Sequence, residues 1–432
     1  MAVEPAGLVS FEEARRLVEN HSSHLRPQGR ELLGLLDANG RVLAEPIHAD
    51  RDFPPFPRAA RDGYAVRAAD LEVLPATLEV IGEIKAGAAP AQIPQLAFGK
   101  AVAIMTGAAA PVGSEAVVMV EHTTRAGDRV EITRSVSAGE NIVPAGSEAK
   151  RGDRLLSPGA RISYAEIAVA AAVGRSRLLV YARPRVAVLA TGDEVVDVDV
   201  LPGPNQIRNS NTYSLAAEIQ AAGGEAVLLP VAPDEPCRLR ELLNEGLEAG
   251  LLLIAGGVSM GKYDLVEQVL EEMKAEFFFT GAKIQPGKPI VFGRVACVAG
   301  ALVRDSAGAD SERQVSETDY CKYFFGLPGN PTSTMVTFEL FARPVIEALA
   351  GMGVRKLNFM HAKLKTALET RIGLKRFLPA SLSGEFEAAE VELVKWLGSG
   401  DIAAVARANC FVVVPPDRER MEAGEWVAVL PR

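Results

Sequence analysis

Buried strands and helices alternate regularly between residues 185 and 351, and this pattern limits the possible folds more than any other part of the chain. RVAVLATGDE, EAVLLP, LLLIAGGVSMG and YFFGLPGNP are apolar runs of strand length, and SNTYSLAAEIQAAGG is a capped helix closed by glycines. Strands that alternate with helices build a mainly parallel sheet with helices on both faces. The sequence therefore predicts a central three-layer α/β domain.

The rest of the 432-residue chain is different in texture, and its length exceeds what one hydrophobic core usually serves. Ser10 and Glu13 form a capping-box pattern at the start of an amphipathic helix. From about 50 to 160, short runs such as TLEVIGEI, KAVAIMTG and AVVMVEHTT lie between Gly, Pro and Asp, which predicts strands joined by turns. The last ~75 residues, with FVVVPP and EWVAVLP, predict a small β barrel or sandwich.

These patterns divide the chain into four parts. We expect a multidomain α/β protein with an elongated N-terminal domain, a β-rich inserted domain, the α/β domain and a C-terminal small β barrel, covering residues 1–50 with 145–182, 51–144, 183–352 and 355–432. Residues 300–320 are rich in small and charged side chains, so we expect a solvated loop there. Its flanks, FGRVACVAG and YCKYFFGLPGN, are expected to be adjacent strands.

Composition excludes several classes of protein. The net charge of −9 argues against a nucleic-acid surface, and no stretch approaches the ~18 apolar residues that a membrane span needs. The N-terminus lacks the basic and apolar pattern of an export signal. The four cysteines form no Cys-x-x-Cys pair, which disfavours a zinc site or a disulfide framework. We therefore expect a cytoplasmic protein without membrane or nucleic-acid partners.

Polar residues follow two of the predicted parallel strands, at the sheet edge where such folds bind ligands. Thr191-Gly192-Asp193-Glu194 ends the first strand, and this tetrapeptide alone is more often an ordinary polar strand end. Gly256-Gly257-Val258-Ser259-Met260-Gly261 follows another strand, and its backbone amides are able to wrap an anion, although a tight turn is the alternative explanation of these glycines. Asp264 comes directly after this glycine loop.

Two Pro- and Gly-containing loops are further candidates. Gln285-Pro286-Gly287-Lys288-Pro289 offers Lys288 as a cation, and Pro328-Gly329-Asn330-Pro331 precedes a helix, although structural turns look similar. Asp234 lies where a helix N-cap belongs, and capping is the more frequent role of such a residue. Nevertheless Glu194, Asp234 and Asp264 all fall at C-terminal strand edges. Carboxylates that converge there suit Mg²⁺, which also keeps waters and phosphate oxygens as ligands.

Two short segments of the β-rich insertion look ordinary by themselves. Arg61-Asp62-Gly63-Tyr64-Ala65 has the Asp-Gly pair of a hairpin turn, and this is the favoured interpretation of the segment in isolation. Thr106, in Ile104-Met105-Thr106-Gly107-Ala108, carries no signal of its own.

Six short motifs occur in a fixed order along the chain: DGYAV, IMTGA, TGDE, GGVSMGKYD, QPGKP and GLPGNP. Together they resemble the molybdopterin molybdenumtransferase family, which includes MoeA and the gephyrin E domain. The resemblance covers essentially the whole chain, and Ala406-Arg407-Ala408-Asn409 is similar to a late motif of the family. It implies a MogA-like α/β domain and a homodimer, with each cleft formed by the α/β domain of one subunit and the β insertion of the other.

The resemblance also implies an activity and a set of site residues. The family inserts molybdate into adenylated molybdopterin, requires Mg²⁺ and releases AMP. The positions that match functional residues of the family are Asp62, Thr106, Glu194, Asp234, Asp264, Pro328 and Pro331. Glu194, Asp234 and Asp264 are then candidate Mg²⁺ or pterin ligands, and Asp62 with Thr106 would close the cleft. The remaining candidates for substrate binding are Glu148, Thr191, Gly256, Gly257, Ser259, Gly261, Lys288, Gly329 and Asn330.

This chain departs from the family at several positions. Glu148 stands where the family often has Asp, and Gln285 stands where many members have Lys, which removes one positive charge. Arg58-Ala59-Ala60-Arg61 replaces a segment that usually contains a serine hydroxyl. The alternatives are an adenylyltransferase acting on molybdopterin and a dimeric scaffold without enzymatic activity. Partner proteins would be the molybdopterin adenylyltransferase or downstream cofactor-handling proteins.

Overall fold

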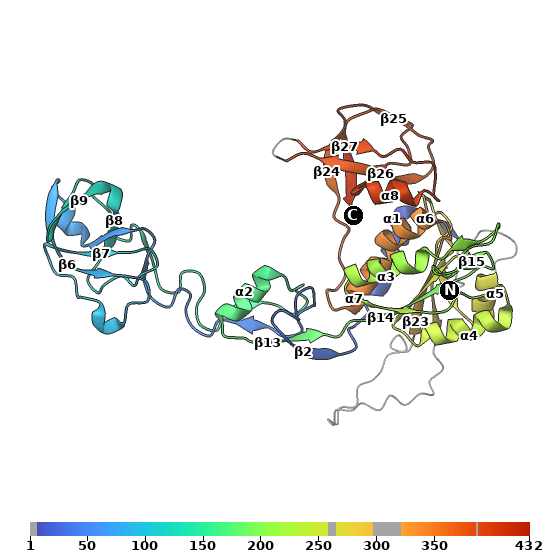
Figure 1. Cartoon of the computed structure of the whole chain (residues 1–432), viewed down its shortest axis with the longest axis horizontal. Coiled ribbons are helices and arrows are strands. Elements are labelled where there is room, and N and C mark those ends of the chain that lie inside the picture. Colours follow the sequence, from blue (N-terminus) through green and yellow to red (C-terminus); the bar gives the residue numbers. More distant parts are fainter. Residues whose placement is uncertain (1–6, 258–264, 297–320, 386–387) are drawn as a thin grey trace, which may run out of the picture.

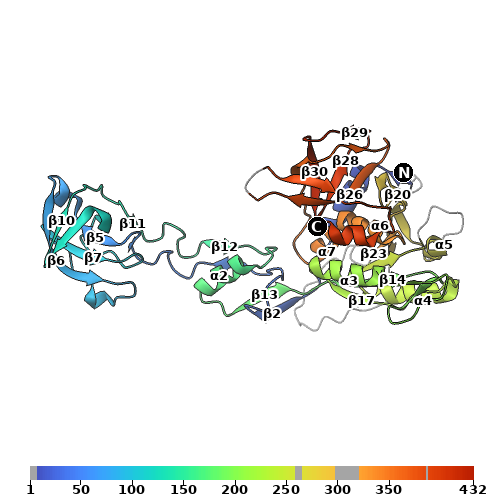
Figure 2. The ribbon, with the colours of Figure 1, turned by 45° about the horizontal axis from the view of Figure 1, so that its top comes forward.

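The computed structural model describes residues 7–257, 265–296, 321–385 and 388–432 and has an elongated shape. Figure 1 shows a β-rich unit at one end, a slender middle part, and an α/β unit with a β barrel stacked on it at the other end; Figure 2 shows the same separation after a turn of the molecule. The β-rich end and the α/β end of one chain therefore lie far apart.

The α/β unit is built on a six-stranded, mainly parallel sheet in the order β17-β14-β18-β23-β22-β19. Its parallel strands are the four that the sequence predicts: β17 (Glu225–Leu228), β14 (Arg185–Ala190), β18 (Leu251–Ala255) and β23 (Cys321–Leu327). The other two strands form antiparallel pairings: β22 (Val291–Ala296) pairs with β23, and β19 (Glu276–Phe279) pairs with β22. The expected pairing of the strands that flank the 300–320 segment is confirmed, since Ala296 is opposite Cys321.

Both faces of this sheet are covered, which confirms the three-layer arrangement. Val186 and Val188 of β14 belong to one apolar core, whereas Ala187 and Leu189 belong to the other. This follows from the alternation of side chains along a strand. The first core includes side chains of α3 (Asn211–Ala221), α6 (Pro331–Thr337), α7 (Arg343–Leu349) and α1 (Phe11–Ser22). The second includes α4 (Pro236–Leu247) and α5 (Leu265–Glu272).

The predicted N-terminal helix is present as α1 and packs against the α/β unit. Ser10 is its N-cap, and the Ser10 hydroxyl accepts a hydrogen bond from the backbone N–H of Glu13 at 3.1 Å. Phe11, Ala14 and Val18 share one helix face and are buried in the first core. Next to α1, β1 (Leu8–Val9) pairs with β20 (Gly281–Ala282) of the α/β unit.

The slender middle part consists of short paired strands and one helix. β2 (Arg30–Gly34) pairs with β13 (Arg177–Tyr181), β3 (Ile47–His48) pairs with β12 (Arg154–Leu156), and α2 (Tyr164–Ala172) is the second predicted helix. Beyond it, β4 (Arg58–Ala59) pairs with β11 (Ile142–Val143) where the chain enters and leaves the insertion.

The insertion is mostly β, as the short β-branched runs predict. Its six-stranded sheet has the order β8-β5-β7-β6-β10-β9. The strands are β5 (Gly63–Val66), β6 (Ala76–Ile84), β7 (Lys100–Ile104), β8 (Ala116–Met119), β9 (Thr123–Ala126) and β10 (Arg129–Ile132). Apolar side chains of these strands form cores on both faces of the sheet.

The C-terminal part is a closed five-stranded barrel, so the choice between barrel and sandwich is resolved. Its strands are β24 (Met360–Leu364), β26 (Lys375–Ser383), β27 (Glu390–Leu393), β28 (Cys410–Val414) and β30 (Trp426–Pro431), and the β26–β28 pairing closes it. α8 (Ile402–Arg407) packs on β26, and β21 (Ile284–Gln285) of the α/β unit pairs with the same strand.

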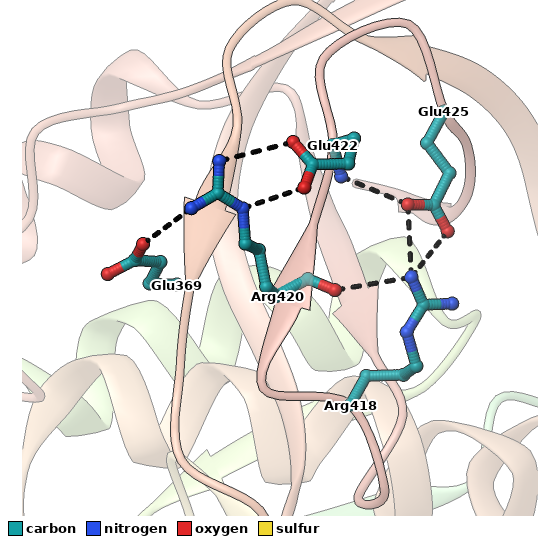
Figure 3. A network of polar contacts seen from close by, with 5 residues as sticks. All are labelled: Glu369, Arg418, Arg420, Glu422 and Glu425. Carbon is teal, nitrogen blue, oxygen red and sulfur yellow. Dashed lines mark hydrogen bonds and ion pairs between the residues drawn. The ribbon is translucent and has the colours of Figure 1, made fainter.

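A surface network links two short strands at the edge of the barrel. β25 (Leu368–Glu369) pairs with β29 (Arg420–Met421), and the Arg420 guanidinium lies 3.0 Å from Glu369 and 2.7 Å from Glu422 (Figure 3). Arg418 and Glu425 form a neighbouring pair at 2.9 Å. Such exposed ion pairs fix local geometry more than they add stability. Within the part of the chain that the structure describes, no helix has the length and apolar character to cross a membrane.

Candidate functional site

A cavity of about 470 Å³ opens at the carboxyl edge of the central sheet. The loops after β14, β18 and β23 meet there, as expected for neighbouring parallel strands, and the start of α3 also lines the cavity. The cavity is lined by residues of all three strand-end motifs: Thr191, Gly192, Glu194, Gly256, Gly257, Pro328, Gly329, Asn330 and Pro331. The separate sequence signals therefore belong to one site.

Backbone approaches the Thr191 side chain closely in this cavity. Gly256 and Gly257 have backbone φ angles of +99° and +63°, a region that residues other than glycine rarely adopt. A Cβ atom on Gly257 would lie 2.8 Å from Thr191 Oγ1, and one on Gly256 would lie 3.2 Å from it. Thr191 is 6% exposed, and its hydroxyl has no hydrogen-bond partner among the described residues. Buried polar groups rarely stay unpaired, so this hydroxyl is available to a ligand.

Carboxylates also gather at this cavity. Glu194 folds back over Gly192, since a Cβ atom at that glycine would lie 2.4 Å from Glu194 Oε2. Asp193 Oδ1 accepts a hydrogen bond from the backbone N–H of Asp234 at 3.1 Å. Partial burial, together with the charges of Asp193 and Glu194, raises the pKa of Asp234. Mutual repulsion of this kind is relieved by a bound cation.

The alternative role of Asp234 as a helix cap is wrong. The N-cap of α4 is Glu235, and Asp234 precedes it by one residue and lines the cavity instead. Glu194 and Asp234 fit a Mg²⁺ site in which waters and substrate phosphate complete the ligand set. No cluster of three or more His, Cys, Asp or Glu side chains able to hold a metal occurs among the residues that the structure describes. Asp264, Ser259 and Gly261 lie outside the described residues.

A second cavity, of about 660 Å³, adjoins the first and shares Pro289, Pro328 and Asn330 with it. Lys288 lines this second cavity and not the first, between the α/β unit and the C-terminal barrel. Trp396 of the barrel lines it too, and the indole N–H of Trp396 is buried without a partner among the described residues. A lysine and an unpartnered N–H donor suit a small oxyanion.

Asp62 and Thr106, unremarkable apart, form one unit at the other end of the molecule. Asp62 Oδ1 accepts hydrogen bonds from the backbone N–H of Thr106 at 2.6 Å and from its hydroxyl at 2.8 Å. The backbone N–H of Thr106 and then its hydroxyl hold the pKa of Asp62 below its usual value, so the carboxylate is ionised at neutral pH.

The hairpin-turn interpretation of Asp62-Gly63 is also wrong. Gly63 is the first residue of β5, and its φ is not among the positive ones. A Cβ atom there would lie 1.8 Å from the carbonyl oxygen of Val118 on the neighbouring strand β8. The glycine is needed because two strands approach closely, and not because the chain turns.

One chain does not bring all the candidates together. Asp62 precedes β5 and Thr106 follows β7, both at the β-rich end (Figure 2). Thr191 and Glu194 follow β14 and Asp234 precedes α4, both at the α/β end (Figures 1 and 2). Glu148 lies close to the insertion, where Arg58 Nη2 donates a hydrogen bond to its Oε1 at 2.9 Å. Within one chain these two groups of candidates therefore lie at separate places.

Comparison with known proteins agrees with this geometry. Models of the MoeA N-terminal region (domains I and II), of a probable molybdopterin-binding domain and of the MoeA C-terminal region (domain IV) match residues 9–174, 187–348 and 361–431. A molybdopterin molybdenumtransferase from a Nostoc species is 34% identical, over 93% of this chain and 89% of the relative. The chain belongs to the molybdopterin molybdenumtransferase family. It is an enzyme of molybdenum cofactor biosynthesis.

Two further relatives extend the molybdenumtransferase match over the full chain. A molybdopterin molybdenumtransferase from Staphylococcus aureus is 30% identical over 100% of this chain and 97% of the relative. The crystal structure of a molybdopterin biosynthesis MoeA protein from Pyrococcus horikoshii is 31% identical, with a TM-score of 0.68 over 98% of this chain and 99% of the other. Because the match includes the N- and C-terminal regions, an adenylyltransferase built on the α/β domain alone explains less of this sequence.

Sequence reasoning missed one wall of the cavity in this molybdenumtransferase. Asn209, Ser210 and Asn211 line it at the start of α3. Asn211 Nδ2 donates a hydrogen bond to the backbone oxygen of Gly329 at 2.7 Å and so joins α3 to the Pro328–Pro331 loop. The signal in the sequence is RNSN at the start of a helix, which the capped-helix interpretation had already explained.

Proposed function

We propose that this chain transfers molybdenum from molybdate to adenylated molybdopterin, with Mg²⁺, and releases AMP as the dithiolene sulfurs take the metal. One observation carries the proposal: Glu194 and Asp234 line the same cavity as Gly256, Gly257 and Thr191, whose buried hydroxyl has no hydrogen-bond partner among the described residues. A cation site beside a surface for a phosphorylated heterocycle suits an adenylated pterin.

Glu194 and Asp234 would hold Mg²⁺, with Asp264 as the third predicted carboxylate. When bound, Mg²⁺ supplies positive charge to the phosphate oxygens of the substrate. Glu194 is positioned for this by Gly192, whose φ of +124° and lack of a side chain leave room for the carboxylate. Asp193 keeps the Asp234 backbone in place through the hydrogen bond at 3.1 Å.

Molybdate would enter through the second cavity. Lys288 and the Trp396 indole N–H offer a positive charge and a donor to an oxyanion, and this cavity shares Pro289, Pro328 and Asn330 with the first. The two substrates would thus meet at the loop that begins α6. Gln285 lines the same cavity, so the loss of the lysine usual at this position leaves an amide next to Lys288.

The Asp62–Thr106 unit would reach the cleft from the partner subunit of a homodimer. Its carboxylate is already fixed by two hydrogen bonds and is ionised, so it is prepared to orient a donor group of the substrate without rearrangement. A cytoplasmic setting, together with contacts to the molybdopterin adenylyltransferase or to proteins that receive the cofactor, completes the proposal.

The decisive experiment mixes the purified protein with adenylated molybdopterin, Mg²⁺ and molybdate and measures AMP. We expect molybdate-dependent AMP release. Glu194→Gln should slow it strongly, and raised Mg²⁺ should restore part of the rate, because the lost carboxylate weakens cation binding. Glu235→Gln, one residue beyond Asp234 and outside the cavity lining, is the matched control and should behave as wild type. Absence of AMP release with competent substrate would refute the proposed function.

A further inference from the structure

We propose that Asn211 is a specificity-determining residue: its Oδ1, with the Thr191 hydroxyl, binds the N–H edge of the substrate's heterocycle in the first cavity. This inference rests on the proposed function and adds to it the group that distinguishes the ring from the phosphates. None of the six motifs that carry the family resemblance includes Asn211.

Asn211 is held rigidly by its own amide. It is the first residue of α3, and its Nδ2 donates to the Gly329 oxygen at 2.7 Å. The preceding segment is also fixed, since Asn209 is 6% exposed and its Oδ1 accepts from the backbone N–H of Thr212 at 3.2 Å. A side chain fixed in this way presents its other polar atom at a defined position without further ordering.

Two unpartnered polar atoms remain in this cavity. Asn211 Oδ1 is buried and has no hydrogen-bond partner among the described residues, and the same is true of Thr191 Oγ1. Thr191 ends β14 and Asn211 begins α3, and both residues line the cavity. Two such atoms in one cavity indicate a ligand that pairs with both, because buried polar groups are normally satisfied.

The chemistry of the two atoms restricts the ligand. The Nδ2 of Asn211 is engaged by Gly329, so Oδ1 is left as a pure acceptor, whereas the Thr191 hydroxyl can donate or accept. Phosphate and molybdate oxygens offer no N–H donor to Oδ1 and therefore do not match it. Amino groups and ring N–H groups of a pterin or an adenine do match, and adenylated molybdopterin contains both rings.

Binding of uncharged probes tests this assignment and distinguishes the two rings. Pterin and adenosine lack phosphate, and their affinities for the full-length protein are measured by calorimetry, with sodium pyrophosphate as a probe that has a phosphate but no ring. We expect Asn211→Ala to raise the Kd of one ring about tenfold, the size of one net hydrogen bond, and to leave pyrophosphate binding unchanged. Thr191→Val leaves the hydrogen bond from Asn211 to Gly329 in place and should weaken binding of the same ring. The ring that responds identifies the half of the substrate bound there.

Several results would overturn the assignment. If Asn211→Ala weakens the binding of pyrophosphate as much as the binding of the rings, the residue only holds the Gly329 loop in place. If Thr191→Val or Asn211→Ala binds both rings as tightly as wild type does, Thr191 Oγ1 and Asn211 Oδ1 do not bind the ring. Asn244→Ala, at an exposed position of α4 outside this cavity, is the control for a loss of asparagine. Wild-type AMP release is measured in parallel, so failure of the proposed function is seen separately from failure of the role of Asn211.

Discussion

Gly257 shows how one residue controls the shape of the candidate site. Its φ of +63° and the nearby atoms of Thr191 and Val266 leave no room for a side chain. A Cβ atom would lie 2.6 Å from Val266 Cγ2 and 2.8 Å from Thr191 Oγ1. The cavity therefore depends on the absence of an atom as much as on the presence of the carboxylates.

We predict that Gly257→Ala lowers the free energy of unfolding by about 1–3 kcal/mol through overpacking and strain, and abolishes ring binding. Thermal unfolding and calorimetry measure the two effects. Gly400→Ala is the matched control, because nothing lies within 4 Å of a Cβ atom at Gly400 and its φ is not in the positive region. A wild-type melting curve and wild-type affinity for Gly257→Ala would contradict the close approach.

Thr106→Val should raise the pKa of Asp62 part of the way to its ordinary value. The backbone N–H bond from Thr106 remains, whereas the hydroxyl bond at 2.8 Å is lost. Since the folded-state pKa is depressed, the stabilisation is present above the unfolded pKa and is lost as the pH falls through the folded value. A carboxyl-detected NMR titration of Asp62 measures the shift. Thr124→Val, on β9 of the same sheet, should leave it unchanged.

The residues of the site differ in how far the sequence foretells them. Thr191, Glu194 and the glycines end buried strands, so the fold class alone brings them to one edge. The Asp62–Thr106 pair joins residues 44 apart, and only the packing of β5 beside β7 makes them neighbours. Asn211 was hidden because a helix start already accounts for an asparagine.

At the scale of elements, the β22–β23 pair is the clearest case of adjacent strand ends that are joined by many residues. Ala296 and Cys321 are direct partners in the register, so the strand ends that residues 297–320 connect lie side by side. Closure of a loop costs little more as the loop lengthens, and a short turn can therefore replace a long connection.

Replacement of residues 302–319 by a short Gly-rich turn should leave the melting temperature and the rate of AMP release close to wild type. The reason is that the pairing of β22 with β23 supplies the geometry without them. Steady-state kinetics with adenylated molybdopterin provide the measurement. A large rise in KM for this substrate would instead mean that the segment takes part in binding.

Strands that are buried on both faces were predictable from their apolar runs. The pairing that closes the C-terminal barrel was not visible in the sequence pattern. β14 and β18 are continuous apolar runs because each side chain enters one of two cores. The C-terminal barrel depends on the pairing of β26 with β28, whose partners run from Ala380 with Cys410 to Arg376 with Val414, and short alternating strands do not reveal such a partner. That is why a sandwich stayed open as an alternative to the predicted barrel until the β26–β28 pairing was seen.

The whole molecule is elongated, with β7 at one end and β14 at the other (Figure 1). The Asp62–Thr106 unit lies next to β7, and the carboxylate-lined cavity lies at the end of β14. If two copies complete each other's sites, a mixture of Asp62→Ala and Asp234→Ala should regain activity. Each heterodimer then holds one intact site of two, and heterodimers form half of a random mixture, so about a quarter of wild-type AMP release is expected. Subunit exchange is verified by differently tagged chains. Exchange without any recovery would argue for a site within one chain.

The pairing of β4 with β11 sets the entry and exit of the insertion next to each other, with Arg58 opposite Val143. A unit whose two ends are neighbours can be removed, replaced or moved to another protein with little disturbance of what it leaves behind. The insertion with its two cores is thus an exchangeable module. An exchange of the insertion between relatives would change the side chains that it offers to a partner's cleft. The residues that line the cavity at the α/β sheet would stay the same.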